Sequence, residues 1–510
     1  MPAKNFYDAV LVGLNLPILL AGGLLAKRGF RVLVVGHGQP LPSYEVAGVR
    51  MPRSPFTLTA ADSPAVARVL SELALKQLVQ RKIRPLSPAF QAVFPRHRLD
   101  FHADPERVSR EVEREFPAVR RTADDFMRGT QRAWEGINQL VARDLTWPPS
   151  GFFERREFTR ASVNHPFGRE ELGPVPLGEL ADDHPFRKLA NAVVRFADGS
   201  ALGEQHAERM LRLFGGWLRG AELMDGGDGA LFELLIDSIR AHNGEVRLGD
   251  RVERIVVKRR AVESVRLSPS DEDVGCHFVL SGVPVSRLGR LLSDRTELDS
   301  LLDELGQPRP QFFRYTLNLL VAANALPEGM ARNVFLLDGE HTLAKEHALR
   351  VESDRLPDGK RALITVEALL PAVSPEAQAQ ELTGLRERLL GALDMLSPFI
   401  RAHLELVDSP HDGRGIFHAQ QGTYETPSDH WTRGPETMPV VYAFPRTRIH
   451  GTCALPVRTP IKRLLLCNEQ VVPGLALEGS FLAAWSAART VTRSLNRDWM
   501  NRGRWTKVDL

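Results

Sequence analysis

Residues 8–38 constrain the fold of this chain more than any other part of its sequence. They divide into an apolar run, a turn, a segment of helical length and a second apolar run, at 9–12, 13–17, 18–28 and 31–35. Short apolar runs are typical of buried parallel strands, and Gly29 is a residue type that readily ends a helix. The stretch therefore predicts the opening βαβ unit of a dinucleotide-binding fold.

An alternative interpretation of this stretch is a membrane span or a secretory signal. The 18 residues 9–26 carry no charge and precede Lys27 and Arg28, and this is a marginal length for a spanning helix. Asn15 and Pro17 interrupt the segment, however, and a strand-like run follows at once. The first residues also match the basic start and cleavage site of a signal peptide poorly. We therefore expect a strand and a helix of a globular domain here.

The turn departs from the glycine pattern of dinucleotide-binding folds. That pattern has glycine at positions 13, 15 and 18, but the chain has Gly13, Asn15 and Ile18. The second glycine lets the backbone approach the pyrophosphate, and the third lets helix and strand pack closely. The second strand would end in an acid that binds the ribose hydroxyls, yet Gly36 stands there. The stretch thus predicts the fold more firmly than the cofactor.

Composition excludes several classes of protein. The 510 residues carry a net charge of +3, which argues against a general nucleic-acid binder. Cys276, Cys453 and Cys467 are scattered, so neither a disulfide framework nor a metal site is expected. We found no nucleophile-elbow, zinc-protease or P-loop motif in the sequence. These features favour a globular protein of a reducing cytoplasm.

Three later segments resemble a known superfamily. Residues 225–231 resemble a GG-x-GAL turn, residues 243–257 (NGEVRLGDRVERIVV) a turn and strand, and residues 461–489 a closing strand, turn and helix. Together with the opening stretch, they resemble the FAD-dependent phytoene and carotenoid desaturases and the flavin amine oxidase superfamily. The resemblance implies an α/β fold with a Rossmann-like FAD/NAD(P)-binding domain and a second, α+β substrate domain.

The resemblance also implies a division of the chain. The dinucleotide-binding fold would take residues 1–100 and 221–290, with a mainly helical substrate-region segment at 101–220. A substrate domain with a mixed or antiparallel sheet would span 291–455, and a last strand, closing helix and basic tail 456–510. Within the substrate domain we expect strands at 308–320, 334–337 and 362–369 and an amphipathic helix at 377–396.

Candidate cofactor-binding residues follow from the resemblance alone and lie in the first turn, at the second strand, beside the adenine and in the closing turn. They are Gly13, Leu14, Asn15, Leu16, Gly36, Val256, Asn468, Glu469, Pro473, Gly474, Glu478 and Gly479. Glu478 is the one catalytic candidate, and the alternative is an acid favoured by the dipole at a helix start. We expect residues 474–479 to lead into a helix at 480–489 and to face the same cleft as Gly13.

Two functional hypotheses remain open at this stage. The first is an FAD-dependent oxidoreductase that removes a hydride from an apolar, isoprenoid-like substrate. The second is a non-catalytic binding or chaperone-like protein on the same scaffold that has lost FAD. The second rests on departures at Asn15, Ile18, Gly36, residues 39–42 and the Asn468-Glu469 pair. A third, an adaptor without a small ligand, would show a filled cleft between the domains.

The expected partner is an apolar small molecule or a lipid-like ligand, and no nucleic acid. The C-terminal tail carries Arg497, Arg502, Arg504 and Lys507. Such a tail suits contact with an anionic membrane surface, although a solvated terminal helix explains it as well. We therefore expect a cytoplasmic protein, with contact at the inner face of the membrane as a further hypothesis.

Overall fold

The computed structural model describes residues 5–163, 177–197, 206–337 and 348–495. Its first sheet has seven strands in the order β10-β11-β12-β1-β2-β9, with β21 paired to β12. The strands are β1 (Asn5–Val12), β2 (Val32–Val35), β9 (Glu245–Arg247), β10 (Arg251–Lys258), β11 (Ala261–Ser268), β12 (Glu272–Ser281) and β21 (Leu464–Leu466). Strand β1 lies between β12 and β2 and is parallel to both, which confirms the predicted βαβ opening.

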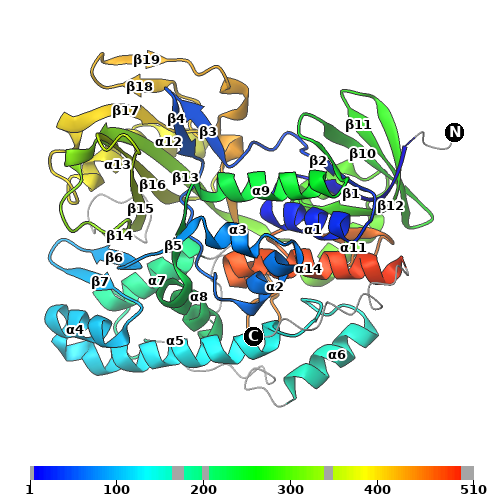
Figure 1. Ribbon diagram of the computed structural model, residues 1–510, viewed down its shortest axis with the longest axis horizontal. Helices are drawn as coiled ribbons and strands as arrows, with labels where there is room; N and C mark the ends of the chain where they lie inside the picture. The colour runs from blue at the N-terminus through cyan, green and yellow to red at the C-terminus, as the bar shows by residue number, and fades with distance from the viewer. Residues whose placement is uncertain (1–4, 164–176, 198–205, 338–347, 496–510) are drawn as a thin grey trace.

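Three apolar helices cover this sheet, as Figure 1 shows. They are α1 (Leu16–Lys27), α9 (Gly227–Ala241) and α14 (Ala476–Ser494). Helix α1 is buried from Leu16 to Ala26 because it packs on both α9 and α14. Helix α14 begins at Ala476, four residues before the predicted start at Ser480. No helix among the described residues is long and apolar enough to cross a membrane.

The second sheet has ten strands in the order β19-β18-β17-β13-β16-β15-β14-β6-β7, with β20 paired to β13. All pairs are antiparallel except β6 with β14. Its strands are β6 (Phe90–Val93), β7 (Arg98–Phe101), β13 (Arg309–Ala322), β14 (Asn333–Leu337), β15 (Ala348–Arg355), β16 (Arg361–Pro371), β17 (Leu404–Asp408), β18 (Ile416–His418), β19 (Thr423–Glu425) and β20 (Val440–Ala443). The β6–β7 hairpin thus joins this sheet, although the expected first segment, 1–100, includes it.

The single helix predicted at 377–396 is wrong. Two helices, α12 (Pro375–Leu382) and α13 (Leu385–Leu393), replace it. Gly384 separates them with a φ of +71°, a conformation that a continuous right-handed helix does not contain and that glycine adopts without steric cost. The two sheets together confirm the predicted combination of a Rossmann-like domain and a second, mostly antiparallel domain.

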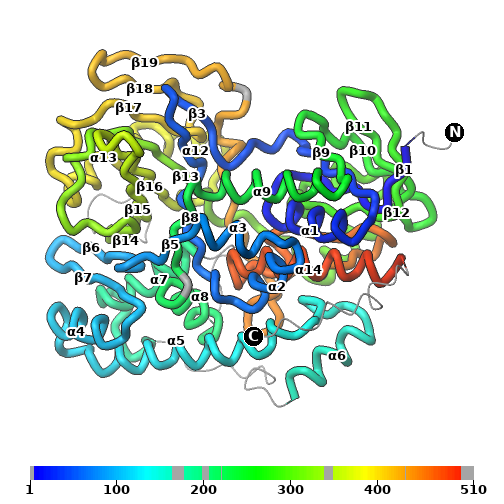
Figure 2. The backbone as a smooth tube through the Cα atoms, in the orientation of Figure 1, coloured from blue at the N-terminus to red at the C-terminus, as the bar shows by residue number. Residues whose placement is uncertain are grey.

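A helical region lies beside both sheets, at the lower part of the backbone trace in Figure 2. It contains α4 (Pro105–Glu115), α5 (Arg120–Val141), α6 (Phe152–Ser162), α7 (Pro185–Ala197) and α8 (Ala207–Gly220). The remaining elements that the text uses are β3 (Ser43–Val46), β4 (Val49–Pro52) and α2 (Pro64–Glu72). Asp104 caps the start of α4, because its carboxylate accepts the N–H of Glu106 at 3.0 Å.

Candidate functional site

The turn after β1 binds a side chain of the protein itself. The backbone N–H of Leu14 donates to Oε1 of Gln39 at 2.5 Å. Gly13 has a φ of +116°, and a Cβ added there would lie 3.1 Å from the same oxygen. In dinucleotide-binding folds the N–H groups of this turn and of the first helical turn face the pyrophosphate. Gln39 therefore occupies a position that a phosphate oxygen would need.

Asn15 closes the start of α1 in a similar way. Its Oδ1 accepts the N–H of Ile18 at 3.1 Å, and its Nδ2 donates to the carbonyl of Gly282 at 2.7 Å. A Cβ added to Gly282 would lie 2.4 Å from Cγ1 of Ile18. The close approach between helix and sheet that the third glycine usually permits is therefore retained, with the glycine on the neighbouring chain segment after β12.

Gly36, at the end of β2, lies against the segment after β9. Its N–H donates to the carbonyl of Arg247 at 2.9 Å, and a Cβ added to it would lie 2.3 Å from the carbonyl oxygen of Leu248. No side chain fits there without a backbone shift, so an acid at this position is excluded by packing. Of the other candidates on this side, Leu16 is the buried first residue of α1, and Val256 lies in β10, paired with Ser264.

The closing turn lies beside the first turn. Oε2 of Glu469 is 3.4 Å from Nδ2 of Asn15, although β12 separates β1 from β21. Asn468 is buried, with its Nδ2 donating to the carbonyl of Val283 at 2.8 Å. The structure therefore brings the two turns together, but they do not follow adjacent strands.

The proline and glycine residues of the closing turn serve its packing. Pro473 and Gly474 lie in a short 3₁₀ turn before α14. Added Cβ atoms on Gly474 and Gly479 would lie 2.4 Å from the Gly451 carbonyl oxygen and 2.0 Å from the Val472 carbonyl oxygen. Both glycines are therefore required by close backbone contacts, whatever the cleft binds.

Glu478, the catalytic candidate, is part of a buried ion pair. Its carboxylate accepts from Nε and Nη2 of Arg212 in α8, at 3.1 and 2.6 Å, and from the hydroxyl of Ser63. Both charged side chains are 2% exposed, and the Arg212 guanidinium lies 3.7 Å from the ring centroid of Trp134. Glu478 thus joins α14 to α8 and α2, and it does not line the cavity described next.

A cavity of about 260 Å³ lies between the closing turn, the second sheet and the helices α7 and α8. Its apolar wall includes Phe56, Phe196, Trp217 and Leu477, and its charged wall Arg314, Arg350, Glu367 and Glu469. This volume is at the lower end of ligand pockets, which measure about 300–1,000 Å³. The cleft between the domains is therefore hollow and mixed in character.

Three buried polar atoms of residues that line the cavity have no hydrogen-bond partner in the described part of the chain: Nε of Arg350, Nε1 of Trp217 and Oε2 of Glu367. All three side chains are at least nine-tenths buried. Unsatisfied buried polar groups are rare and costly in proteins. Each of these atoms is itself covered by protein and does not open onto the cavity.

Glu469 lines this cavity and is surrounded by protein on its other sides. The side chain is exposed, yet the surrounding protein restricts solvation, and this desolvation raises the pKa of its carboxyl to about 7. Hydrogen bonding to its own backbone N–H opposes the shift. A carboxyl with such a pKa exchanges protons near neutral pH.

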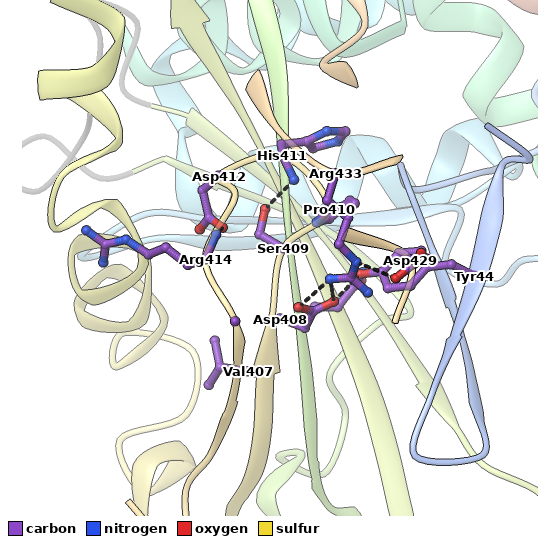
Figure 3. Close-up of polar contacts among 12 residues, drawn as sticks. Tyr44, Val407, Asp408, Ser409, Pro410, His411, Asp412, Arg414, Asp429 and Arg433 are labelled. Carbon is purple, nitrogen blue, oxygen red and sulfur yellow. Dashed lines mark hydrogen bonds and ion pairs between the residues drawn. The ribbon is translucent and has the colours of Figure 1, made fainter. Parts of the chain in front are cut away.

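A second polar cluster, drawn in Figure 3, connects the β3–β4 hairpin to β13 and β17. Arg433 donates to both carboxylate oxygens of Asp408 at 2.8 and 2.9 Å, and the Tyr44 hydroxyl donates to the same carboxylate at 2.7 Å. Ser409 donates to a carbonyl of β13 rather than to the ring of His411, and burial lowers the pKa of His411 to about 4. The cluster therefore stabilises the fold and contains no activated nucleophile. No group of metal-ligating side chains occurs in the described part of the chain.

The residues around the first turn do not fit FAD in the position that the resemblance implies. The side chain of Gln39 accepts a hydrogen bond from the Leu14 N–H, and that of Asn15 accepts one from the Ile18 N–H. The Leu248 carbonyl occupies the space that a side chain at position 36 would need. To bind there, FAD would have to displace the Gln39 side chain before its pyrophosphate could accept the Leu14 N–H. The backbone at Leu248 would also have to move before a side chain at position 36 could bind the ribose.

Comparison with known proteins gives a family and a fold. The family model described as flavin containing amine oxidoreductase matches residues 54–492, a range that begins after the opening βαβ unit. No curated protein matches the chain.

Solved structures agree in architecture. An oxidoreductase from Methanosarcina mazei has a TM-score of 0.58 at 16% identity, covering 94% of this chain and 99% of that chain. Cyclohexylamine oxidase from Brevibacterium oxydans has a TM-score of 0.57 at 13% identity, covering 96% and 99%. A putrescine oxidase bound to putrescine has a TM-score of 0.58 at 14% identity, covering 96% and 99%. Identities this low establish the fold alone.

Proposed function

The chain belongs to the flavin containing amine oxidoreductase family, and we propose that it is a binding protein that takes a small, lipid-like ligand between its domains without FAD. The observation that carries this proposal is the hydrogen bond from the Leu14 N–H to Gln39. A turn whose N–H group is already paired gains little from a phosphate, because binding would exchange one hydrogen bond for another.

The cavity supports the choice of ligand. Aromatic side chains of Phe56, Phe196 and Trp217 would contact an apolar body. The arginines of the charged wall, Arg314 and Arg350, suit an anionic or carbonyl-bearing head. A pure hydrocarbon would remove water from this charged wall and give nothing in return, so we propose an amphipathic ligand small enough for about 260 Å³.

The second candidate is an FAD-dependent oxidoreductase of the desaturase type that removes a hydride from an apolar, isoprenoid-like substrate. The contact between Glu469 and Asn15 favours the oxidoreductase, because it shows that the two turns that would flank a flavin lie side by side. The contacts of Gln39 and Gly36 oppose it. The colour of the purified protein separates the candidates: a colourless protein that does not take up added FAD supports the binding protein, and a yellow one supports the oxidoreductase.

Binding in the cavity is tested with two fluorescent probes of similar shape. 1-Anilinonaphthalene-8-sulfonate carries a sulfonate, and N-phenyl-1-naphthylamine is uncharged. We expect the charged probe to bind more tightly, because only its sulfonate is attracted to the arginines of the cavity wall. Leu477→Trp should weaken both probes about tenfold by overfilling the cavity, at about 1.4 kcal/mol. Leu477→Met, which keeps the volume, should bind them normally, and equal binding by both variants would place the probes elsewhere.

A further inference from the structure

Helix α6 exposes large apolar side chains on the surface of the protein. Phe152 and Phe153 are each 75% exposed and Val163, which directly follows the helix, is 72% exposed. The two phenyl rings meet edge to face with centroids 5.5 Å apart. Exposed side chains of this size cluster where a protein contacts a partner or a membrane. The helix lies at the lower edge of the molecule in Figures 1 and 2.

The same face of α6 is basic. Arg155, Arg156 and Arg160 are exposed, and none of them forms an ion pair with any residue that the structure describes. Residues 152, 156, 159 and 163 follow the spacing of one helix face, with 153, 155 and 160 beside them. This face therefore combines aromatic and basic side chains.

The two acidic residues of the helix, Glu154 and Glu157, both contact the rest of the protein. Glu154 is buried, where its carboxylate accepts the N–H groups of Ser150 and Gly151 at 3.0 and 3.1 Å. Glu157 pairs with Arg489 of α14 at 3.1 Å. Phe158 packs against Trp147 with ring centroids 5.2 Å apart. These contacts fix α6 to the body of the protein, and both acids are already engaged, although Glu157 stays 40% exposed beside its arginine partners.

We propose that the outer face of α6, defined by Phe152, Phe153, Arg155, Arg156, Arg160 and Val163, docks onto an anionic membrane surface. Phenyl rings insert at the boundary between headgroups and acyl chains, while arginines on the same face contact anionic headgroups. The charge argues for lipid over an apolar protein partner, because a protein groove would bury three unpaired cations. The inference is independent of the ligand and of FAD.

Vesicle co-sedimentation of the full chain tests this. We expect binding to phosphatidylcholine vesicles that contain phosphatidylglycerol, weakening with salt, and no binding to phosphatidylcholine alone. Replacing all three arginines by glutamine should weaken binding about a hundredfold, since each contributes about fivefold, the equivalent of about 1 kcal/mol at an anionic surface. Phe152→Ser with Phe153→Ser should also abolish binding.

Phe399→Ser is the matched control, because Phe399 is 73% exposed in the second domain, and it should bind vesicles normally. All variants keep the basic C-terminal tail, so undiminished binding by the α6 variants would assign the contact to another part of the chain and overturn the proposal. Failure of the wild type to bind would also overturn it. A dimer that only the phenylalanine variants lose would assign the face to self-association instead, and preferential binding of RNA would assign it to nucleic acid.

Discussion

The Leu14 N–H and the Gln39 side chain form a hydrogen bond of 2.5 Å across the turn in which this family's fold would hold a pyrophosphate. Leu14 lies in the turn after β1 and Gln39 in the loop after β2, so the bond joins the segments that follow the two strands of the opening βαβ unit. A side-chain amide oxygen thereby takes the place of a ligand oxygen. The turn is structural in this chain, and its contribution should be measurable as stability.

Removing the Gln39 side chain should destabilise the protein. Leu14 is 5% exposed, so Gln39→Ala leaves a nearly buried N–H without a partner at a cost of about 1–2 kcal/mol. Urea unfolding measures the difference. Gln39→Glu is the control, because it keeps an acceptor and places a negative charge near the start of α1, where the helix dipole favours anions. Equal stability of wild type and Gln39→Ala would show that the bond contributes nothing.

Gly36→Ala should destabilise the protein by about 1–3 kcal/mol, the usual range for overpacking. Its Cβ would lie 2.3 Å from the Leu248 carbonyl oxygen. Gly249→Ala is a matched control one residue further along that segment, because an added Cβ there meets nothing within 4 Å. Chemical unfolding of both variants provides the test. Similar losses of unfolding free energy would mean that the segment after β9 moves away from position 36 at little cost. Replacing Gly36 by an acid to restore a ribose contact should therefore harm the fold.

Much of the fold could be predicted from the sequence because its signals are local. The strands at 9–12 and 32–35 and the helix between them are almost entirely buried, and such segments show as continuous hydrophobicity. The second sheet was also predictable from its apolar strands. The error at Gly384 has a physical cause, since a glycine within a helical pattern either continues the helix or ends it, and only tertiary packing decides which.

The site was less predictable because its contacts join distant segments. The sequence shows that position 18 lacks a glycine, but not that Gly282 supplies the close approach instead. It gives no sign that Arg212 would pair with Glu478, 266 residues away. The family resemblance pointed to Glu469 and Pro473 of the cavity wall, and Glu367, a charged residue within a predicted apolar strand, was a further signal. A charged residue inside an otherwise apolar strand therefore indicates a polar cleft or a buried ion pair at that position.

Breaking the ion pair of Glu478 should cost far more than breaking an exposed one. Glu478→Gln leaves the buried Arg212 charge without its counter-ion, and such a loss typically costs about 3–5 kcal/mol. Asp125→Asn is the control, because its pair with Arg128 is exposed and should be worth less than about 1 kcal/mol. Thermal unfolding compares the two. The apolar double variant Arg212→Met with Glu478→Leu should recover part of the loss, which a catalytic role for Glu478 does not predict.

Glu469 should make the stability of the protein depend on pH. Its pKa lies near 7 in the folded protein, above the ordinary value of 4.5, so the folded state holds a proton that the unfolded state loses between these values. Stability is then complete below about pH 4.5 and falls as the pH rises toward 7. Glu469→Gln removes this dependence, because an amide needs no proton in the cavity. We therefore expect the variant to gain stability relative to wild type as the pH rises, and to show no further gain above about pH 7 to 8.

Urea unfolding across this pH range measures the effect as the difference between variant and wild type. The difference isolates Glu469 from Glu72 and Asp228, whose pKa values burial also raises to about 7. A constant difference for Glu469→Gln would mean that water in the cavity solvates the carboxylate as fully as bulk solvent does. The cavity would then be open rather than enclosed, and a ligand bound beside Glu469 would gain little from leaving water.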